Sequence, residues 1–146
     1  MDKFDERILR ELQDNGRIAN VELAERVGLS ASATLRRVQE LEKQGVISGY
    51  KAIVNKTAMG VGFVAYVSIG LASHSKKAQL EFEQHVQFVD EVVECHNITG
   101  ANEYMLRVET ADLPAYKRFH ADVLGECKQV DAITTMVVMD SPKDQR

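Results

Sequence analysis

Cysteine is scarce in this chain of 146 residues, which contains only Cys95 and Cys127, far apart and without CxxC spacing. A disulfide framework or a structural zinc site is therefore not expected. No apolar run approaches the roughly 18 residues that a membrane helix needs. The acidic residues 1–6 also lack the apolar core of a signal peptide. These absences predict a cytoplasmic protein that does not use a membrane.

Net positive charge is also missing, because the formal net charge is −4, and this argues at first against a nucleic-acid partner. The charge is unevenly distributed, however. Residues 1–55 hold nine Lys/Arg and nine Asp/Glu, whereas residues 56–146 hold nine and thirteen. Between Arg26 and Lys51 there are five basic residues and only two acidic ones. Since DNA affinity depends on the charge at the contact face, DNA binding remains compatible with this chain, with oligomerisation offsetting weak affinity per subunit.

Motifs for catalysis are absent as well. Neither GxxxxGK nor GxGxxG, the usual phosphate-binding loops, occurs. Cys95 and His96 are neighbours on a predicted strand, so their side chains point to opposite faces and share neither a metal ion nor a nucleophile–base hydrogen bond. The length leaves no room for a catalytic domain besides the two described below. We therefore expect a protein that is not an enzyme and uses neither a metal nor another cofactor.

Residues 1–55 have the pattern of three short helices. The first helix has an apolar stripe at Phe4, Ile8, Leu9 and Leu12. Asn20 is expected to cap the second helix, and Gly28 to end it after two turns. Ala24 and Gly28 are small, which predicts a close crossing of the second and third helices. Ser30 or Ser32 then caps the third helix. A short helix, a turn with glycine and a helix entered by serines form a helix-turn-helix.

A helical wheel of the third helix predicts which side chains face outward. Leu35, Val38 and Leu41 are expected to face inward, whereas Arg36 lies on the exposed face and Arg37 beside it. Thr34 falls nearer the buried side, where packing is its expected role. A recognition helix reads bases mainly with its N-terminal residues and holds phosphates with its flanks. The candidate DNA contacts are Ser30, Ser32, Ala33, Thr34, Arg36, Arg37, Gln39 and Lys51.

Two alternatives remain open for this region. The exposed arginines also fit an ordinary three-helix bundle with a solvated charged face. The segment 46–54 after the third helix has the pattern of an extended chain. It is expected to be either a small wing or a linker strand, with Lys51 available for phosphate.

The remainder of the chain has the pattern of a doubled β-α-β unit. Glycines at 60 and 62 mark the boundary, which gives a helix-turn-helix domain at 1–55 and a second domain at 60–146. Strands are expected at 63–72, 92–99, 103–110 and 130–139, with helices at 76–89 and 112–123. This order predicts a ferredoxin-like βαββαβ sandwich, so the whole chain is α/β in the broad sense and α+β more strictly. Its helices cover one sheet face, and apolar residues on the other face predict a homodimer.

An ordered series of motifs is similar to one protein family over about residues 2–140. The stretches are DERILRELQ at 5–13, GRI at 16–18, ELAERVGLS at 22–30, RRV at 36–38, LEKQGVI at 41–47, TG at 99–100 and YMLRV at 104–108. The chain closely resembles the Lrp/AsnC family, also called feast/famine regulatory proteins. This resemblance implies a regulator that binds double-stranded DNA as a dimer, often assembled into an octamer, with an amino acid tuning its assembly or its DNA affinity.

The resemblance also implies a ligand pocket between dimers, around the loop that joins the second and third strands of the second domain. Backbone N–H groups freed by Gly100 suit a carboxylate, and Asn102 or Glu103 can accept from an ammonium. The candidate ligand residues are Gly100, Ala101, Asn102, Glu103, Tyr104, Thr134 and Thr135. Family loops commonly carry Asp where this chain has Glu103, which leaves pocket size and ligand identity open. The alternative is a plain hairpin turn, with Tyr104 in the core.

The sequence thus predicts a sequence-specific DNA-binding transcription regulator whose DNA affinity or assembly responds to a small effector, an amino acid. A different class of function is an architectural nucleoid protein whose octamer wraps DNA with little effector control. An amino acid that shifts the oligomeric size or the operator affinity would separate the two.

Overall fold

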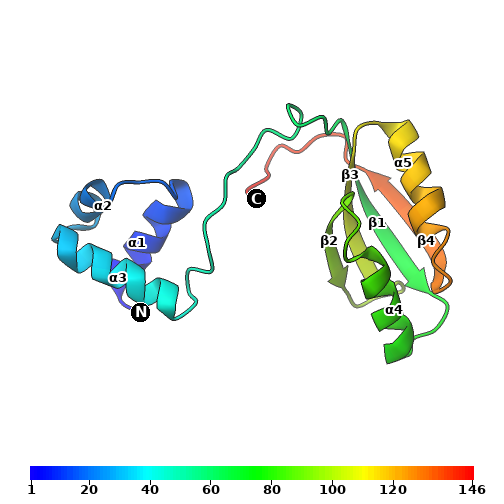
Figure 1. The fold of residues 1–146 in the computed structure, drawn as a ribbon, viewed down its shortest axis with the longest axis horizontal. Coiled ribbons are helices and arrows are strands. Elements are labelled where there is room, and N and C mark those ends of the chain that lie inside the picture. Colours follow the sequence, from blue (N-terminus) through cyan, green and yellow to red (C-terminus); the bar gives the residue numbers. More distant parts are fainter. The chain divides into compact units, whose positions relative to one another are not determined.

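The computed structural model describes all 146 residues, which form two compact units, Met1–Ile53 and Val54–Arg146 (Figure 1). The first unit contains three helices, α1 (Lys3–Asp14), α2 (Asn20–Val27) and α3 (Ala31–Lys43). Their shared core consists of Ile8, Leu23, Val27 and Leu41, none of them more than 3% exposed. The predicted three-helix arrangement is therefore confirmed.

The helix ends in this unit agree only in part with the sequence prediction. Gly28 follows α2 in the left-handed conformation, with φ of 77°, which residues with a side chain rarely adopt. A Cβ atom at Gly28 would meet nothing within 4 Å, so a close helix crossing is not the reason for this glycine. Asn20 does not cap α2, because Ala19 occupies that position. The side-chain amide of Asn20 instead donates to the carbonyl of Ala31 at 2.8 Å, which ties the start of α2 to the start of α3.

The buried stripe of α3 is rotated relative to the predicted one. Leu35 is 47% exposed, and the buried position beside it is Thr34. The hydroxyl of Thr34 donates to the carbonyl of Ser30 at 2.9 Å, so it is buried without an unsatisfied polar group. The stripe runs from Thr34 through Val38 to Leu41, at i, i+4 and i+7. The inward orientation expected for Leu35 was wrong.

The segment expected to form a small wing or a linker strand pairs with no strand. Residues 46–54 carry neither helix nor strand. The first unit contains no other strand, so this segment has no partner for a backbone ladder. It is anchored to the unit through Ile47, which packs against the core, and Tyr50, whose ring lies beside Gly16.

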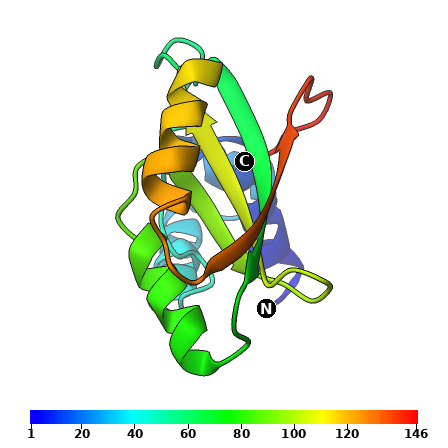
Figure 2. The same cartoon turned by 90° about the vertical axis from the view of Figure 1, so that its right-hand side faces the viewer.

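The second unit is a four-stranded antiparallel sheet with two helices on one face (Figure 2). Its elements are β1 (Phe63–Leu71), α4 (Lys76–Val86), β2 (Val92–Asn97), β3 (Tyr104–Thr110), α5 (Leu113–Phe119), a π-helical turn (His120–Leu124) and β4 (Val130–Val137). The strand order is β2-β3-β1-β4, so β2 and β4 are the edges. This is the predicted βαββαβ sandwich. No helix in the protein is both long and apolar enough to cross a membrane.

The core of this unit lies between the sheet and its helices. Alternate residues of β1, such as Val67 and Ile69, are fully buried there against Phe82 of α4 and Phe119 of α5. The opposite side of the sheet, which has no helix over it, is termed the open face. It carries Val64, Tyr66, Ser68, Met105, Arg107, Glu109, Thr134 and Met136.

The open face is more polar than the sequence suggested. Arg107 at its centre is only 7% exposed. Its guanidinium donates to the Tyr66 hydroxyl at 2.9 Å and to a Glu109 carboxylate oxygen at 3.1 Å, and it lies 5.4 Å from the centre of the Tyr66 ring. Met105 and Met136 lie at neighbouring positions of the sheet, and Arg146 adds a further donor to the Tyr66 hydroxyl at 3.3 Å.

Candidate functional site

The N-terminal half of α3 presents its polar side chains to solvent. Ser32, Arg36 and Gln39 are exposed, and Ala33 is half-buried. Ser30 is the N-cap, and its hydroxyl oxygen accepts from the N–H of Ala33 at 3.2 Å. Its hydroxyl also lies 3.4 Å from that of Ser32, and both hydroxyls are exposed. These side chains and the exposed backbone of the helix start form one surface, termed the reading face.

Two neighbouring arginines on α3 have opposite environments. Arg36 makes no hydrogen bond or ion pair within the chain and is exposed. Arg37 turns toward α1, where its Nη1 lies 2.8 Å from Asp2 Oδ2 and 3.2 Å from Asp5 Oδ1. Its guanidinium also lies 5.3 Å from the centre of the Phe4 ring. The structure therefore leaves the Arg36 guanidinium without a partner and engages that of Arg37 within the protein.

Two other predicted DNA contacts also differ in their surroundings. Thr34 is fully buried, so it supports α3 from behind and is removed from the candidate contacts. Lys51 is exposed and unpaired in the segment that follows α3. A lysine in such a segment suits a phosphate contact, which needs a positive charge and no fixed geometry.

The loop between β2 and β3 is closed at its base and open at its tip. The carbonyl of Glu103 accepts from the N–H of Ile98 at 2.8 Å and from the side chain of Asn97 at 3.1 Å. At the tip, Gly100 has φ of 119° and is exposed, as is Ala101. The N–H groups of residues 99–102 donate to no acceptor in the chain. They are therefore available to an anionic group.

Asn102 and Glu103 anchor this loop to β1. The Asn102 amide donates to the Ser68 hydroxyl at 2.8 Å on the open face. The Glu103 side chain is only 13% exposed, and its Oε2 accepts from the N–H of Leu71 at 2.7 Å. Its Oε1 lies 2.6 Å from Nδ1 of His74, a side chain that is 82% exposed. The hydrogen bond from Leu71 and the nearby imidazole hold the pKa of Glu103 below its usual value.

The two threonines of β4 do not converge on one pocket. Thr134 pairs with Ser68 and lies on the open face, whereas Thr135 pairs with Val67 and lies on the face covered by helices. The Thr135 hydroxyl is hydrogen-bonded to that of Tyr116 at 2.5 Å. Because adjacent strand residues alternate between faces, the prediction that both threonines line the ligand site was wrong. Thr135 is half-buried on the face that the helices cover.

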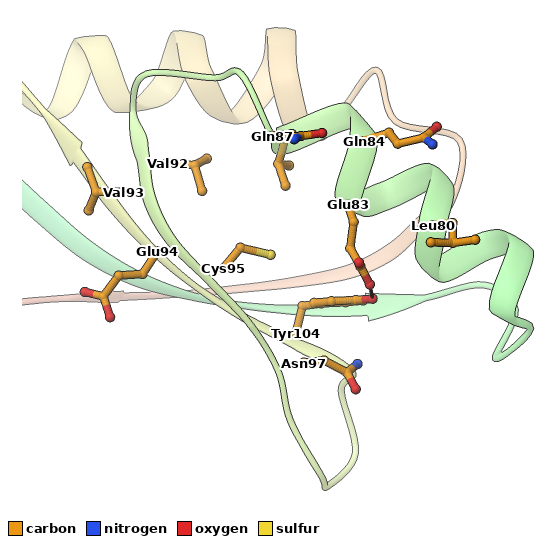
Figure 3. Close-up of a pocket in the computed structure, with 11 residues that line it drawn as sticks. Leu80, Glu83, Gln84, Gln87, Val92, Val93, Glu94, Cys95, Asn97 and Tyr104 are labelled. Atoms are coloured by element: carbon orange, nitrogen blue, oxygen red, sulfur yellow. Dashed lines mark hydrogen bonds between the residues drawn. The ribbon is translucent and has the colours of Figure 1, made fainter. Parts of the chain in front are cut away.

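Tyr104 is part of a groove between α4 and β2, on the face of the sheet that the helices cover (Figure 3). It is 1% exposed, and its hydroxyl donates to the carboxylate of Glu83. Burial and the Glu83 carboxylate raise the pKa of Tyr104. The groove has a volume of about 580 Å³ and is lined by Leu80, Glu83, Gln84, Val86, Gln87, Val92, Val93, Glu94, Cys95, Asn97 and Tyr104.

Sequence reasoning missed two side chains in these regions. Glu83 accepts the Tyr104 hydrogen bond, and no local spacing signals a contact across 21 positions. His74 lies beside Glu103, and nothing in the sequence linked these two residues. The opposite orientation of Cys95 and His96 is confirmed, because they pair with Leu106 and Met105 on alternate faces. No cluster of three metal-ligating side chains occurs in the structure.

Both units match known domain families. Residues 1–48 match a winged helix-turn-helix DNA-binding domain, and residues 64–146 match the Lrp/AsnC ligand binding domain. A DNA-binding helix-turn-helix joined to a ligand-binding βαββαβ unit defines a ligand-responsive transcription regulator.

Similarity to whole proteins identifies the family. The chain is 40% identical to the leucine-responsive regulatory protein of Rhizobium meliloti over 144 residues, which cover 99% of this chain and 92% of that protein. It is 38% identical to the protein of the same name from Escherichia coli, over 98% of this chain and 87% of that protein. The chain belongs to the Lrp/AsnC family of transcription regulators.

Solved structures agree with this assignment. A transcriptional regulator from Neisseria meningitidis, solved as a complex with L-methionine, has a TM-score of 0.94 and 34% identity over 99% of this chain and 93% of its own. A feast or famine regulatory protein from M. tuberculosis, also complexed with L-methionine, has a TM-score of 0.89 and 30% identity over 99% of this chain and 96% of its own.

Proposed function

We propose that this regulator binds a free α-amino acid at the loop between β2 and β3, and that binding changes its assembly or its affinity for DNA. The observation that carries the proposal is the environment of Glu103. Its carboxylate is largely buried and fixed by the Leu71 N–H, yet its second oxygen meets only the exposed imidazole of His74. L-methionine in two related regulators supports this class of ligand.

The two charged groups of an amino acid fit the two ends of the loop. The free N–H groups of residues 99–101 suit the α-carboxylate, because successive backbone N–H groups form an anion-binding concavity. The α-ammonium suits Oε1 of Glu103, where it would replace His74. A fixed, ionised carboxylate gives a strong, charge-assisted hydrogen bond to such a cation. Gly100, Ala101, Asn102 and Glu103 therefore stay in the proposed site, with Thr134 near Asn102 on the open face.

We further propose that the open face is covered by a second copy of the chain, and that such dimers assemble into an octamer. Met136 is 43% exposed there, and Arg107 is already nearly buried without a partner. A symmetric contact would exclude water from both clusters. The ligand loop borders this face through Asn102 and Ser68, which gives a route by which an amino acid affects assembly.

The proposed DNA contacts are Ser30, Ser32, Ala33, Arg36 and Gln39 of the reading face, together with Lys51. The exposed, unpaired guanidinium of Arg36 is the residue best placed to read a base edge, because arginine binds guanine with two parallel hydrogen bonds. Lys51 is proposed to contact phosphate.

Thermal denaturation with added ligands tests the amino-acid proposal, since a ligand that binds only the folded state raises the melting temperature. L-methionine and L-leucine are measured beside D-methionine, L-methionine methyl ester and the analogue of methionine without its amino group. We expect the free L-amino acid to raise the melting temperature, and each analogue without one charged group to have little effect.

Size-exclusion chromatography with light scattering and binding to DNA selected from a random pool are then measured with the same ligands. If none of the twenty common amino acids changes the melting temperature, the oligomeric size or the DNA affinity, the proposal is wrong and the architectural function is favoured. If the methyl ester acts like methionine, the carboxylate does not bind the loop.

A further inference from the structure

The first turn of α1 holds the DNA-reading helix through a single side chain. Arg37 donates from Nη1 to both carboxylate oxygens of Asp2, at 2.9 and 2.8 Å, and to Asp5 at 3.2 Å. Its guanidinium carbon lies over the ring of Phe4, 5.3 Å from the ring centre. These contacts join positions 35, 32 and 33 residues apart and cross from α3 to α1. We name Asp2, Phe4, Asp5 and Arg37 the N-terminal clamp.

We propose that Arg37 is a positioning residue, which fixes the orientation of α3 through the N-terminal clamp and does not itself contact DNA. The charge of the clamp supports this role. Two carboxylates lie within 3.2 Å of one guanidinium, so the cluster carries a net negative charge. A phosphate brought to Arg37 would also meet Asp2 and Asp5, and their repulsion would offset the attraction of the arginine.

The geometry of α1 gives the clamp its rigidity. Asp2 is the N-cap of α1 and accepts from the N–H of Asp5 at 3.0 Å, while Asp5 accepts in return from the N–H of Asp2 at 3.4 Å. The carboxylates that bind Arg37 are therefore fixed to the backbone at the start of α1. The hydrogen bond from Asp5 and the guanidinium of Arg37 lower the pKa of Asp2, so it remains ionised at neutral pH.

The clamp complements the other contact that places α3. Asn20 holds the first turn of α3 through the carbonyl of Ala31, whereas Arg37 holds its middle. Arg36 projects from the helix one residue away, and base readout requires its guanidinium to reach one base edge with correct geometry. A small rotation of α3 would displace it. The first residues of the chain are thus part of the reading unit although they belong to another helix.

In a double variant, Asp2→Asn with Asp5→Asn, DNA affinity is expected to change in opposite directions for the two possible roles of Arg37, phosphate contact and positioning residue. Asparagine still caps a helix, so α1 keeps its start. If Arg37 bound phosphate, the variant would free a cation and remove two negative charges, and affinity for all DNA would rise. If Arg37 positions α3, affinity for DNA selected by the parent protein falls by about tenfold, equivalent to about 1.4 kcal/mol, while affinity for random DNA does not fall.

The matched control is Glu6→Gln with Glu25→Gln, which removes the same charge from α1 and α2 at exposed residues without side-chain partners in the structure. It is expected to increase affinity for selected and random DNA alike, by a similar small factor. Circular dichroism and melting curves establish that each variant is folded at the temperature of the DNA measurement. A rise in affinity for selected DNA in both double variants would overturn the proposal.

If the double variant does not fold, two substitutions of Arg37 itself distinguish a positioning role from a phosphate contact. Arg37→Lys keeps the charge, but its ammonium ends one bond short of the position of Nη1 and it has no planar group to lie over Phe4, so we expect it to lose affinity for selected DNA. Arg37→Ala should lose that affinity without changing the slope of log K against log salt concentration. A phosphate contact predicts the reverse, with Arg37→Lys close to the parent and a slope about 0.9 smaller in Arg37→Ala.

Discussion

The imidazole of His74 and the carboxylate of Glu103 lie 2.6 Å apart, and the first is 82% exposed whereas the second is 13% exposed. The pair therefore joins a fixed anion to a side chain that solvent reaches freely. A contact with so exposed a partner contributes little to stability. Its location at the proposed ammonium site gives it a different significance, because His74 occupies the oxygen that the ligand would need.

Removing His74 is predicted to strengthen ligand binding. In His74→Ala, an ammonium no longer competes with the imidazole for Oε1 of Glu103, so the dissociation constant for L-methionine should decrease by a few-fold in calorimetric titration. The control is Lys76→Ala, which removes an exposed cation two residues away without touching Glu103. An increase of the dissociation constant in His74→Ala alone would make the imidazole part of the binding site.

Protonation of Glu103 should loosen the loop at acidic pH. The hydrogen bond from Leu71 keeps its folded-state pKa below the ordinary value of 4.5. The stabilising contribution is therefore complete above about pH 5 and is lost as the pH falls from 4.5 through the lower folded-state pKa. Glu103→Gln can still accept from Leu71 but carries no charge. Its melting temperature should lie below that of the parent at pH 7 and approach it as the pH falls below 4.5 through the folded-state pKa of Glu103.

The response to L-methionine should disappear in Glu103→Gln at every pH, since the ammonium has lost its counter-charge. A normal response would contradict the assignment of the ammonium to Glu103. Glu109→Gln tests whether the loss is specific, because Glu109 is an equally buried carboxylate on β3 that binds Arg107.

Gly70 is predicted to be necessary for the position of the ligand loop. A Cβ atom at this residue would lie 2.6 Å from Oδ1 of Asn102 and 3.2 Å from the Cβ of Ala132. In Gly70→Ala the side chain of Asn102 must move and lose its hydrogen bond to Ser68. We expect a weaker response to L-methionine in the thermal assay with the fold retained, because the displaced group is one flexible side chain. A response equal to that of the parent would show that Asn102 does not position the loop.

The apolar periodicity of the chain made its architecture predictable, because the pattern of a helix or a strand depends only on residues close together in the sequence. All nine long elements, α1 to α5 and β1 to β4, lie where the sequence placed them, with ends shifted by a few residues. The side chains that fix these elements against one another were less predictable. Leu35 belongs to the apolar pattern of α3 but is 47% exposed, and only the packing of the three helices shows this. Thr34 is buried, as the helical wheel predicted, and its hydroxyl is satisfied by the carbonyl of Ser30.

In the candidate sites too, features that depend on neighbouring residues were predictable, and contacts between distant segments were not. The loop around Gly100 was found through resemblance and glycine chemistry. Its anchors Leu71 and His74, and the partners of Arg37, come from segments distant in the chain, so no spacing could reveal them. Arg36 and Arg37 are indistinguishable as residue types, and only their contacts in three dimensions separate a free guanidinium from an engaged one.

Tyr104 is predicted to support the fold and not to bind the ligand. Tyr104→Phe removes the hydroxyl that bonds to Glu83 but keeps the ring packed on Phe82, whose centre is 4.8 Å away. Loss of one such hydrogen bond costs about 1 kcal/mol of unfolding free energy. Chemical denaturation should show this decrease, and the response to L-methionine should be unchanged. A lost response in a folded Tyr104→Phe protein would return the phenol to the ligand site.

Arg36 should determine base preference without contributing to stability. It has no partner within the chain, so Arg36→Ala should melt at the temperature of the parent. Its affinity for DNA selected by the parent should fall by about tenfold or more, since one bidentate contact discriminates bases by roughly 1–3 kcal/mol. Lys51→Ala provides the contrast, because loss of a phosphate contact weakens selected and random DNA equally and reduces the salt slope by about 0.9. If Arg36→Ala instead weakened binding to both DNAs by the same factor, Arg36 would be a phosphate contact, and base readout would have to come from Ser32, Ala33 or Gln39.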